Sequence, residues 1–127
     1  MGDLVNNQAS TEEVSIFLEN AKKLVAAGKY DFVPRRKNMQ ALARHGFLIA
    51  DAKEKILELI FGDYYKGPKQ DFNGTGEIWE FKKNVDGIPF YIKIKIVKEN
   101  GEDILKCLGF HEDDFVSSME GSDEKIL

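Results

Sequence analysis

The sequence predicts an α+β fold, with N-terminal helices followed by a small antiparallel β-sheet. Apolar residues recur at helical spacing in three segments before residue 62, and they alternate with polar residues after residue 76. The alternating part contains Asp86-Gly87 and Asn100-Gly101, dipeptides that favour tight turns between antiparallel strands. With 127 residues and 43% hydrophobic content, the chain fits one domain with its own core.

The expected domain spans residues 10–113, between a disordered N-terminus at 1–9 and an acidic tail at 114–127. The formal net charge is −4, yet residues 21–110 carry 17 basic against 12 acidic side chains, a net +5. This basic body is compatible with a polyanionic ligand. No apolar run approaches the length of a membrane span, so we expect a cytoplasmic protein. With one cysteine and two histidines, no metal or other cofactor is expected.

Three helices are predicted in the first half of the chain. The first begins at the capping residue Ser10 and ends at Gly28. A short connection, 29–33, leads to a second helix at 35–45 that follows a proline and stops at a glycine. Asp51 is expected to cap the third helix, which runs through residue 60.

Residues 63–75 are predicted to form a loop, because they are rich in turn formers. The loop is long for a small domain and contains two tyrosines beside two lysines. Long loops of this kind are either disordered or functional, which makes Lys66 and Lys69 candidate site residues.

The two runs that flank Asp86-Gly87 predict a β-hairpin with a two-residue turn. If Val85 lies opposite Ile88, the pairing of every other residue follows, because opposed side chains share one face of the sheet. One face is then apolar. The other presents one acid, three amines and a phenol: Glu80, Lys82, Tyr91, Lys93 and Lys95.

The second turn leaves two registers open. A three-residue loop at 99–101 places Leu108 and Phe110 on the apolar face, and Cys107, Gly109 and His111 on the polar face. A two-residue Asn-Gly turn reverses this assignment. We take the three-residue loop as the expectation.

The predicted polar face gathers the groups that metal-free RNA cleavage requires. Such cleavage needs a base for the ribose 2′-OH, cations for the phosphate and an acid for the leaving oxygen. Glu80 or Tyr91 is placed for the base and His111 for the acid. Lys66 and Lys93 are placed to hold the scissile phosphate, and the further candidate RNA ligands are Lys69, Lys82 and Lys95.

Other interpretations of these residues remain open. Lysines on an exposed sheet face commonly serve solubility, and Glu80 opposite Lys93 is an ordinary cross-strand pair. Asp71 and the run Glu80-Phe81-Lys82 match the D…ExK spacing of magnesium-dependent nucleases. The run Arg35-Arg36-Lys37, at the start of the second helix, suits a non-enzymatic protein that binds phosphate with the help of the helix N-terminus. A further alternative is a non-catalytic regulator that binds RNA or protein through the basic face of the sheet.

Several short runs also resemble a known family. They are Leu24-Val25-Ala26-Ala27-Gly28, Asp63-Tyr64-Tyr65-Lys66, Glu77-Ile78-Trp79-Glu80, Phe90-Tyr91-Ile92-Lys93-Ile94 and Leu108-Gly109-Phe110-His111-Glu112. Together they resemble the motility quorum-sensing regulator (MqsR) toxins over roughly residues 16–113. The resemblance implies a RelE/YoeB-like fold and a toxin of a type II toxin–antitoxin system. Such a toxin is an mRNA interferase, an endoribonuclease that cleaves mRNA without a metal and is held inactive by an antitoxin protein.

The resemblance also implies roles for individual residues. The site lysine of the family falls on Lys66 and its strand tyrosine on Tyr91. Glu80 stands where a glutamine is familiar, and His111 stands where a lysine is familiar. These two departures keep a polar pair that can exchange protons.

Overall fold

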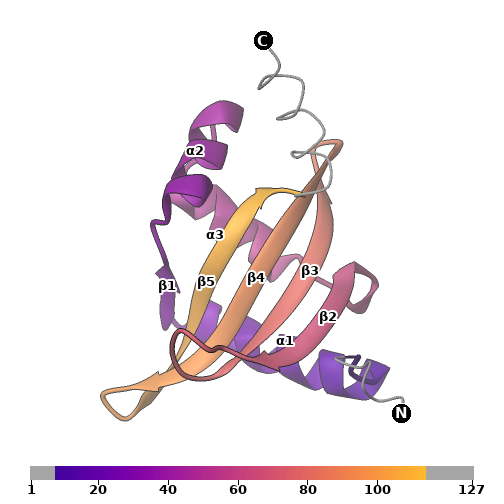
Figure 1. The fold of residues 1–127 in the computed structure, drawn as a ribbon, viewed down its shortest axis with the longest axis vertical. Helices are drawn as coiled ribbons and strands as arrows, with labels where there is room; N and C mark the ends of the chain where they lie inside the picture. The colour runs from indigo at the N-terminus through magenta and orange to yellow at the C-terminus, as the bar shows by residue number, and fades with distance from the viewer. Residues whose placement is uncertain (1–7, 114–127) are drawn as a thin grey trace.

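The computed structural model describes residues 8–113 and has the predicted α+β architecture (Figure 1). A single five-stranded sheet has the order β1-β5-β4-β3-β2, in which β1 is parallel to β5 and the other pairs are antiparallel. The elements are α1 Thr11–Ala26, β1 Tyr30–Phe32, α2 Arg36–His45, α3 Ile49–Leu57, a 3₁₀ turn at Phe61–Asp63, β2 Tyr64–Gln70, β3 Glu77–Val85, β4 Ile88–Glu99 and β5 Glu102–Glu112. Within these residues, none of the helices is long and apolar enough to cross a membrane.

The N-terminus predicted to be disordered, 1–9, and the predicted acidic tail, 114–127, lie outside the described residues except for Gln8 and Ala9. These two residues contact β2, since Gln8 bridges Gly67 and the Ala9 N–H donates to the hydroxyl of Tyr64 at 2.8 Å.

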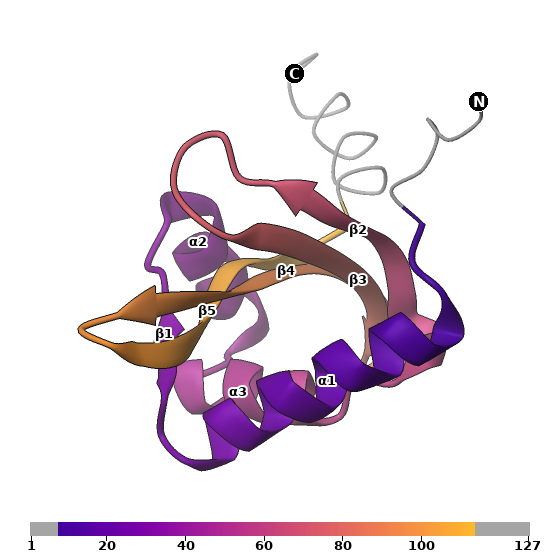
Figure 2. The same cartoon turned by 90° about the horizontal axis from the view of Figure 1, so that it is seen from below.

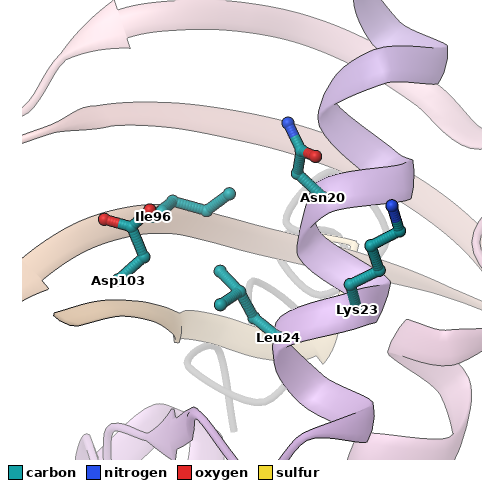
Figure 3. A pocket seen from close by; sticks show the side chains of 5 residues that line it. All are labelled: Asn20, Lys23, Leu24, Ile96 and Asp103. Carbon is teal, nitrogen blue, oxygen red and sulfur yellow. The ribbon is translucent and has the colours of Figure 1, made fainter.

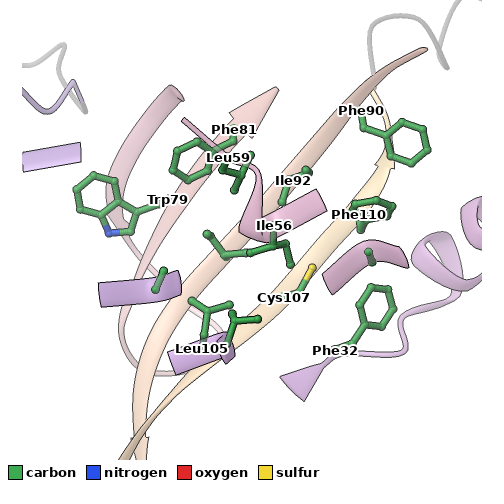
Figure 4. Close-up of a cluster of buried hydrophobic side chains, with 14 of the residues drawn as sticks. Phe32, Ile56, Leu59, Trp79, Phe81, Phe90, Ile92, Leu105, Cys107 and Phe110 are labelled. Atoms are coloured by element: carbon green, nitrogen blue, oxygen red, sulfur yellow. The ribbon is translucent and has the colours of Figure 1, made fainter. Parts of the chain in front are cut away.

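Helices α1 and α3 cover one face of the sheet (Figure 2). The predicted capping box opens α1, because Ser10 accepts a hydrogen bond from the Glu13 N–H while the Glu13 carboxylate accepts one from the Ser10 N–H. Phe17 of α1 stacks on Trp79 of β3, with ring centroids 4.3 Å apart. The core between the two layers is rich in aromatic rings (Figure 4) and includes Phe32, Ile56, Leu59, Trp79, Phe81, Phe90, Ile92, Leu105, Cys107 and Phe110.

Two segments predicted as connections are strands. Residues 29–33 contain β1, whose three residues are too few to show an alternating pattern. The predicted loop 63–75 contains β2, an edge strand whose register shifts twice around Gly67-Pro68. Glycine and proline are tolerated at such irregular edges, so turn-forming residues were a poor guide here.

The third helix has different limits from those predicted. It begins at Ile49 rather than after Asp51, and it ends at Leu57 rather than at residue 60. Asp51 still supports the helix start, because its carboxylate accepts a hydrogen bond from the Leu48 N–H at 2.7 Å.

The predicted register of the β3–β4 hairpin is confirmed. Val85 lies opposite Ile88, Glu80 opposite Lys93 and Lys82 opposite Tyr91. Asp86 and Gly87 both have positive φ, at 53° and 86°, as a type I′ turn requires.

The β4–β5 hairpin differs from the prediction at its turn. Glu99 lies opposite Glu102, so the turn has two residues, Asn100 and Gly101, instead of three. The same turn puts Cys107 opposite Ile94 and into the core, where the polar face had been predicted. A bulge then shifts the register between Lys93 and Ile94, and it returns Phe110 to the core and His111 to the polar face as predicted.

Candidate active site on the open face of the sheet

The candidate site lies on the face of the sheet opposite α1 and α3. The connection between β2 and β3, residues 71–76, rises above this face and passes over β4 (Figures 1 and 2). Most of the predicted site residues meet here, at the centre of the sheet, because β3, β4 and β5 are neighbours.

Glu80 is the buried centre of this face. The residue is 0% exposed, and its carboxylate accepts a hydrogen bond from the Tyr91 hydroxyl and lies 2.8 Å from the Lys69 ammonium. Burial raises the pKa of Glu80, but the hydrogen bonds from Lys69 and Tyr91 and the charges of Lys69 and Lys66 outweigh it and lower the pKa below its usual value. The carboxylate is therefore ionised at neutral pH and already has two partners.

Tyr91 and His111 lie side by side. They are directly opposed across β4 and β5, with ring centroids 5.5 Å apart. The His111 ring is buried, and its Nδ1 lies 2.9 Å from the Glu112 carbonyl oxygen, whereas Tyr91 is half-buried. The Lys93 ammonium is 5.7 Å from the centre of the Tyr91 ring. Acid, phenol, imidazole and amine thus form one cluster over three strands, in which Tyr91 is opposite His111 and Glu80 is opposite Lys93.

A second group of cations surrounds Tyr65 at the β2 edge. The ammonium groups of Lys66 and Lys82 lie 5.3 Å and 4.0 Å from the centre of the Tyr65 ring. Lys66 is the direct neighbour of Glu80 in the sheet. Lys82 also forms an ion pair with Asp113 at 3.3 Å. These lysines add positive charge beside the Glu80 and Tyr91 pair.

Lys95, predicted as a phosphate ligand, has another role in the structure. It is buried, and its ammonium binds the Asp71 carboxylate at 2.5 Å and the Thr75 carbonyl oxygen at 2.7 Å. The hydrogen bonds from Lys95 and the Asn73 N–H, together with the charges of Lys95 and Arg35, lower the pKa of Asp71 although burial raises it. Lys95 therefore fixes the 71–76 connection over the sheet.

Helix α2 fixes the strand that carries His111. Asn38 is buried and donates from Nδ2 to the carbonyl oxygens of Val33 and Leu108, both at 3.0 Å. Its Oδ1 accepts a hydrogen bond from the Phe110 N–H at 2.9 Å. The bonds to Leu108 and Phe110 satisfy backbone groups at the bulge, where the strand ladder is interrupted.

A second contact between α2 and β5 lies on the other side of His111. Arg44 binds the Glu112 carboxylate with two hydrogen bonds of 2.9 Å and 2.7 Å, and His45 lies 2.6 Å from the same carboxylate. The hydrogen bonds from Arg44 lower the pKa of Glu112 to about 2, with burial opposing the shift and His45 adding to it. His45 is the last residue of α2, and its contact with Glu112 also joins this helix to the sheet.

Asp71 and Glu80, the two carboxylates of the D…ExK pattern, bind different partners in this structure. Asp71 is bound by Lys95, and Glu80 is bound by Lys69 and Tyr91. In residues 8–113, no three side chains of His, Cys, Asp or Glu are grouped as a metal site would need.

Three functional contacts were not predicted from the sequence. Asn38 gave no signal because its role depends on a bulge in a distant strand. The partners of Glu112 and Asp71 lie 68 and 24 residues away, at Arg44 and Lys95, so no local pattern connects them.

A hollow on the opposite side of the molecule does not belong to this site. It lies between α1 and the β4–β5 hairpin (Figure 3), and it is lined by Asn20, Lys23, Leu24, Ile96 and Asp103. Leu24 and Ile96 pack against the core on the helical side of the sheet, so the hollow faces away from Tyr91 and His111.

The chain matches no protein-family model, and no curated protein is similar to it in sequence.

Proposed function

We propose that the protein is a metal-independent endoribonuclease that cleaves mRNA by attack of a ribose 2′-OH on the adjacent phosphate. One observation carries this proposal: Tyr91 lies between the ionised Glu80 carboxylate and His111, with lysines on either side. This cluster combines proton-transfer groups with cations, which is the set that this reaction requires.

Tyr91 is the group that meets the 2′-OH in this mechanism. Glu80 is fully buried behind it and cannot contact a ribose, so it acts through the phenol. As the 2′-oxygen attacks phosphorus, the phenol oxygen accepts the 2′ proton and passes its own proton to Glu80 Oε1. Lys66 and Lys93 hold the phosphate oxygens, and sharing their charge with the phosphate raises the basicity of Glu80 at that moment.

His111 completes the reaction as the acid. The protonated imidazole donates a proton to the 5′-oxygen as the P–O bond breaks, which leaves a 2′,3′-cyclic phosphate and a 5′-OH. The proton gained by Glu80 and the proton lost by His111 are then exchanged with solvent. Lys69 and Lys82 add positive potential for the RNA backbone.

The biological setting rests on the resemblance described above. We infer that the protein is the toxin of a type II toxin–antitoxin pair, acts in the cytoplasm, and is inhibited by a cognate antitoxin. The MqsR-like runs that support this contribute Lys66, Glu80, Tyr91 and His111 to the face described here.

Incubation with a long defined RNA in excess EDTA tests the activity. The wild type should make discrete cuts that end in 2′,3′-cyclic phosphate, and a His111→Ala preparation made in parallel should cut at least about 10²-fold more slowly. Equal cutting by both preparations would indicate a contaminating nuclease. Intact RNA in both would contradict the proposal, and cutting restored by Mg²⁺ would favour the magnesium enzyme. Intact RNA that is nevertheless bound in a salt-dependent way would favour a non-catalytic binder.

A further inference from the structure

We propose that Phe72 is a substrate-binding residue that stacks on an unpaired nucleobase of the RNA. The inference deepens the proposed function and rests on it for the identity of the ligand. Phe72 lies on the 71–76 connection and is 92% exposed, whereas the other exposed large hydrophobic side chains of the described residues range from 39% to 70%.

The connection that carries Phe72 is held rigidly at its base. The Asp71 N–H donates to the Gly76 carbonyl oxygen at 3.2 Å, and the Asp71 carboxylate accepts a hydrogen bond from the Asn73 N–H at 3.0 Å. The buried Lys95 ammonium then joins Asp71 to Thr75. A buried ion pair thus fixes a segment whose only large apolar side chain faces solvent.

This segment stands over the same face as the candidate site. The side chain of Lys95 points to it from β4, and Lys93 lies two residues away on the same face of that strand, about 7 Å along it. Arg35 is near enough to Asp71 for its charge to lower the pKa of that carboxyl. Cations from β4 and from the start of α2 therefore lie near the connection.

An exposed aromatic ring among cations is how proteins bind single-stranded nucleic acid. Every base has a face on which a ring can stack, while the cations follow the phosphates. A single exposed apolar residue is ordinary on a protein surface. What distinguishes Phe72 is its combination with a fixed connection and a site that handles phosphate.

The test measures binding of a fluorescein-labelled single-stranded RNA that carries 2′-O-methyl groups and cannot be cleaved by 2′-OH attack. Phe72→Ala should bind about 5- to 150-fold more weakly than the wild type. Phe72→Trp should bind at least as tightly, and Phe72→Leu should resemble the alanine variant because leucine is apolar but cannot stack. Ile16→Ala, which removes an exposed apolar side chain from α1, is the matched control and should bind like the wild type.

Phe72→Trp also gives a direct spectroscopic signal. The single native tryptophan, Trp79, is buried against Phe17, so RNA should quench the new indole and leave the native one unchanged. Tight binding by Phe72→Ala would overturn the inference, as would wild-type binding by Phe72→Leu, which would indicate an ordinary apolar contact. Stacking without cleavage of unmodified RNA would overturn only the catalytic proposal. A wild type that binds no RNA would overturn both.

Discussion

The two hairpins of the sheet share strand β4 and have the same kind of turn, but their strands differ in how regularly they pair before the candidate site. The β3–β4 hairpin keeps a continuous register from Val85–Ile88 to Ile78–Lys95. The β4–β5 hairpin has an equally short turn but is interrupted by a bulge before it delivers His111. The turn at Asp86-Gly87 is therefore enough to fix the positions of Glu80 and Tyr91. The position of His111 also depends on the hydrogen bonds from α2 to β5. Substitutions at Asn38 and Tyr91 should separate these two dependences.

The largest expected effect concerns the apolar face, where the two hairpins should be equivalent. Phe81 and Phe110 lie on either side of Ile92, and both are 0% exposed. Replacing either with alanine should lower the free energy of unfolding by about 3–5 kcal/mol, because each change leaves a large cavity. Urea unfolding followed by circular dichroism measures this. A much smaller cost for Phe110→Ala alone would show that the bulged strand is loosely packed.

Asn38→Ala should distinguish the hairpins. It removes two buried hydrogen bonds at the bulge and a part-buried one to Val33, and it should lower the free energy of unfolding by about 2–4 kcal/mol. RNA cleavage should fall further than the fraction of unfolded protein explains, because His111 loses its alignment. Gln40→Ala, an exposed change on the same helix, is the control and should stay within about 0.5 kcal/mol of the wild type. Unchanged cleavage per folded molecule would mean that the bulge holds His111 in position without the hydrogen bonds from Asn38.

The regular hairpin is tested through Tyr91. Tyr91→Phe removes the hydroxyl that donates to Glu80 and should slow RNA cleavage by about 10²-fold. The pKa of Glu80 should rise toward its usual value, because one of the hydrogen bonds that lower it is lost. Carboxyl NMR titration measures the second effect independently of activity.

Tyr30→Phe is the matched control for this change. The Tyr30 hydroxyl is buried and has no hydrogen-bond partner among the described residues, so its loss should leave cleavage unaltered. If Tyr91→Phe cleaves at the wild-type rate, the phenol has no part in proton transfer.

Sequence reasoning succeeded where neighbours in the chain decide the structure. The Asp86-Gly87 turn and the alternation around it were enough for the β3–β4 pairing and for the shared face of Glu80 and Tyr91. His111 was correctly predicted to lie on the polar face, but the turn from which this was predicted is wrong. The predicted three-residue turn is a two-residue turn, and the bulge near Leu108 supplies the extra residue instead.

The remaining errors come from tertiary contacts. Cys107 lies in the core, where burial raises the pKa of its thiol to about 12. Lys95 holds a connection rather than facing solvent, because Asp71 reaches it from another part of the chain. Strand β1 has only three residues and β2 is irregular, so the alternating pattern typical of a strand is missing from both sequences.

The contact between Glu112 and α2 should make the bulged hairpin sensitive to acid. The pKa of Glu112 is about 2 in the folded protein against an ordinary value of 4.5, so its contribution to stability is complete above about pH 4.5. That contribution, about 2–3 kcal/mol, should be lost as the pH falls toward 2. Glu112→Gln should flatten this part of the profile when unfolding is measured between about pH 6 and 2. A variant profile parallel to the wild type would show that other carboxyls cause the acid response.

The smallest expected effect tests whether the turns themselves are equivalent. Gly87 and Gly101 have positive φ angles of 86° and 80°, and a Cβ at either would meet no atom within 4 Å. The cost of alanine is therefore backbone strain alone, about 1–2 kcal/mol at each turn. Equal losses with unchanged cleavage would show that both turns are stable enough for the strands beyond them to keep their register. A loss of cleavage in Gly101→Ala alone would show that strain at the turn reaches the bulge, and that His111 is held from both ends of β5.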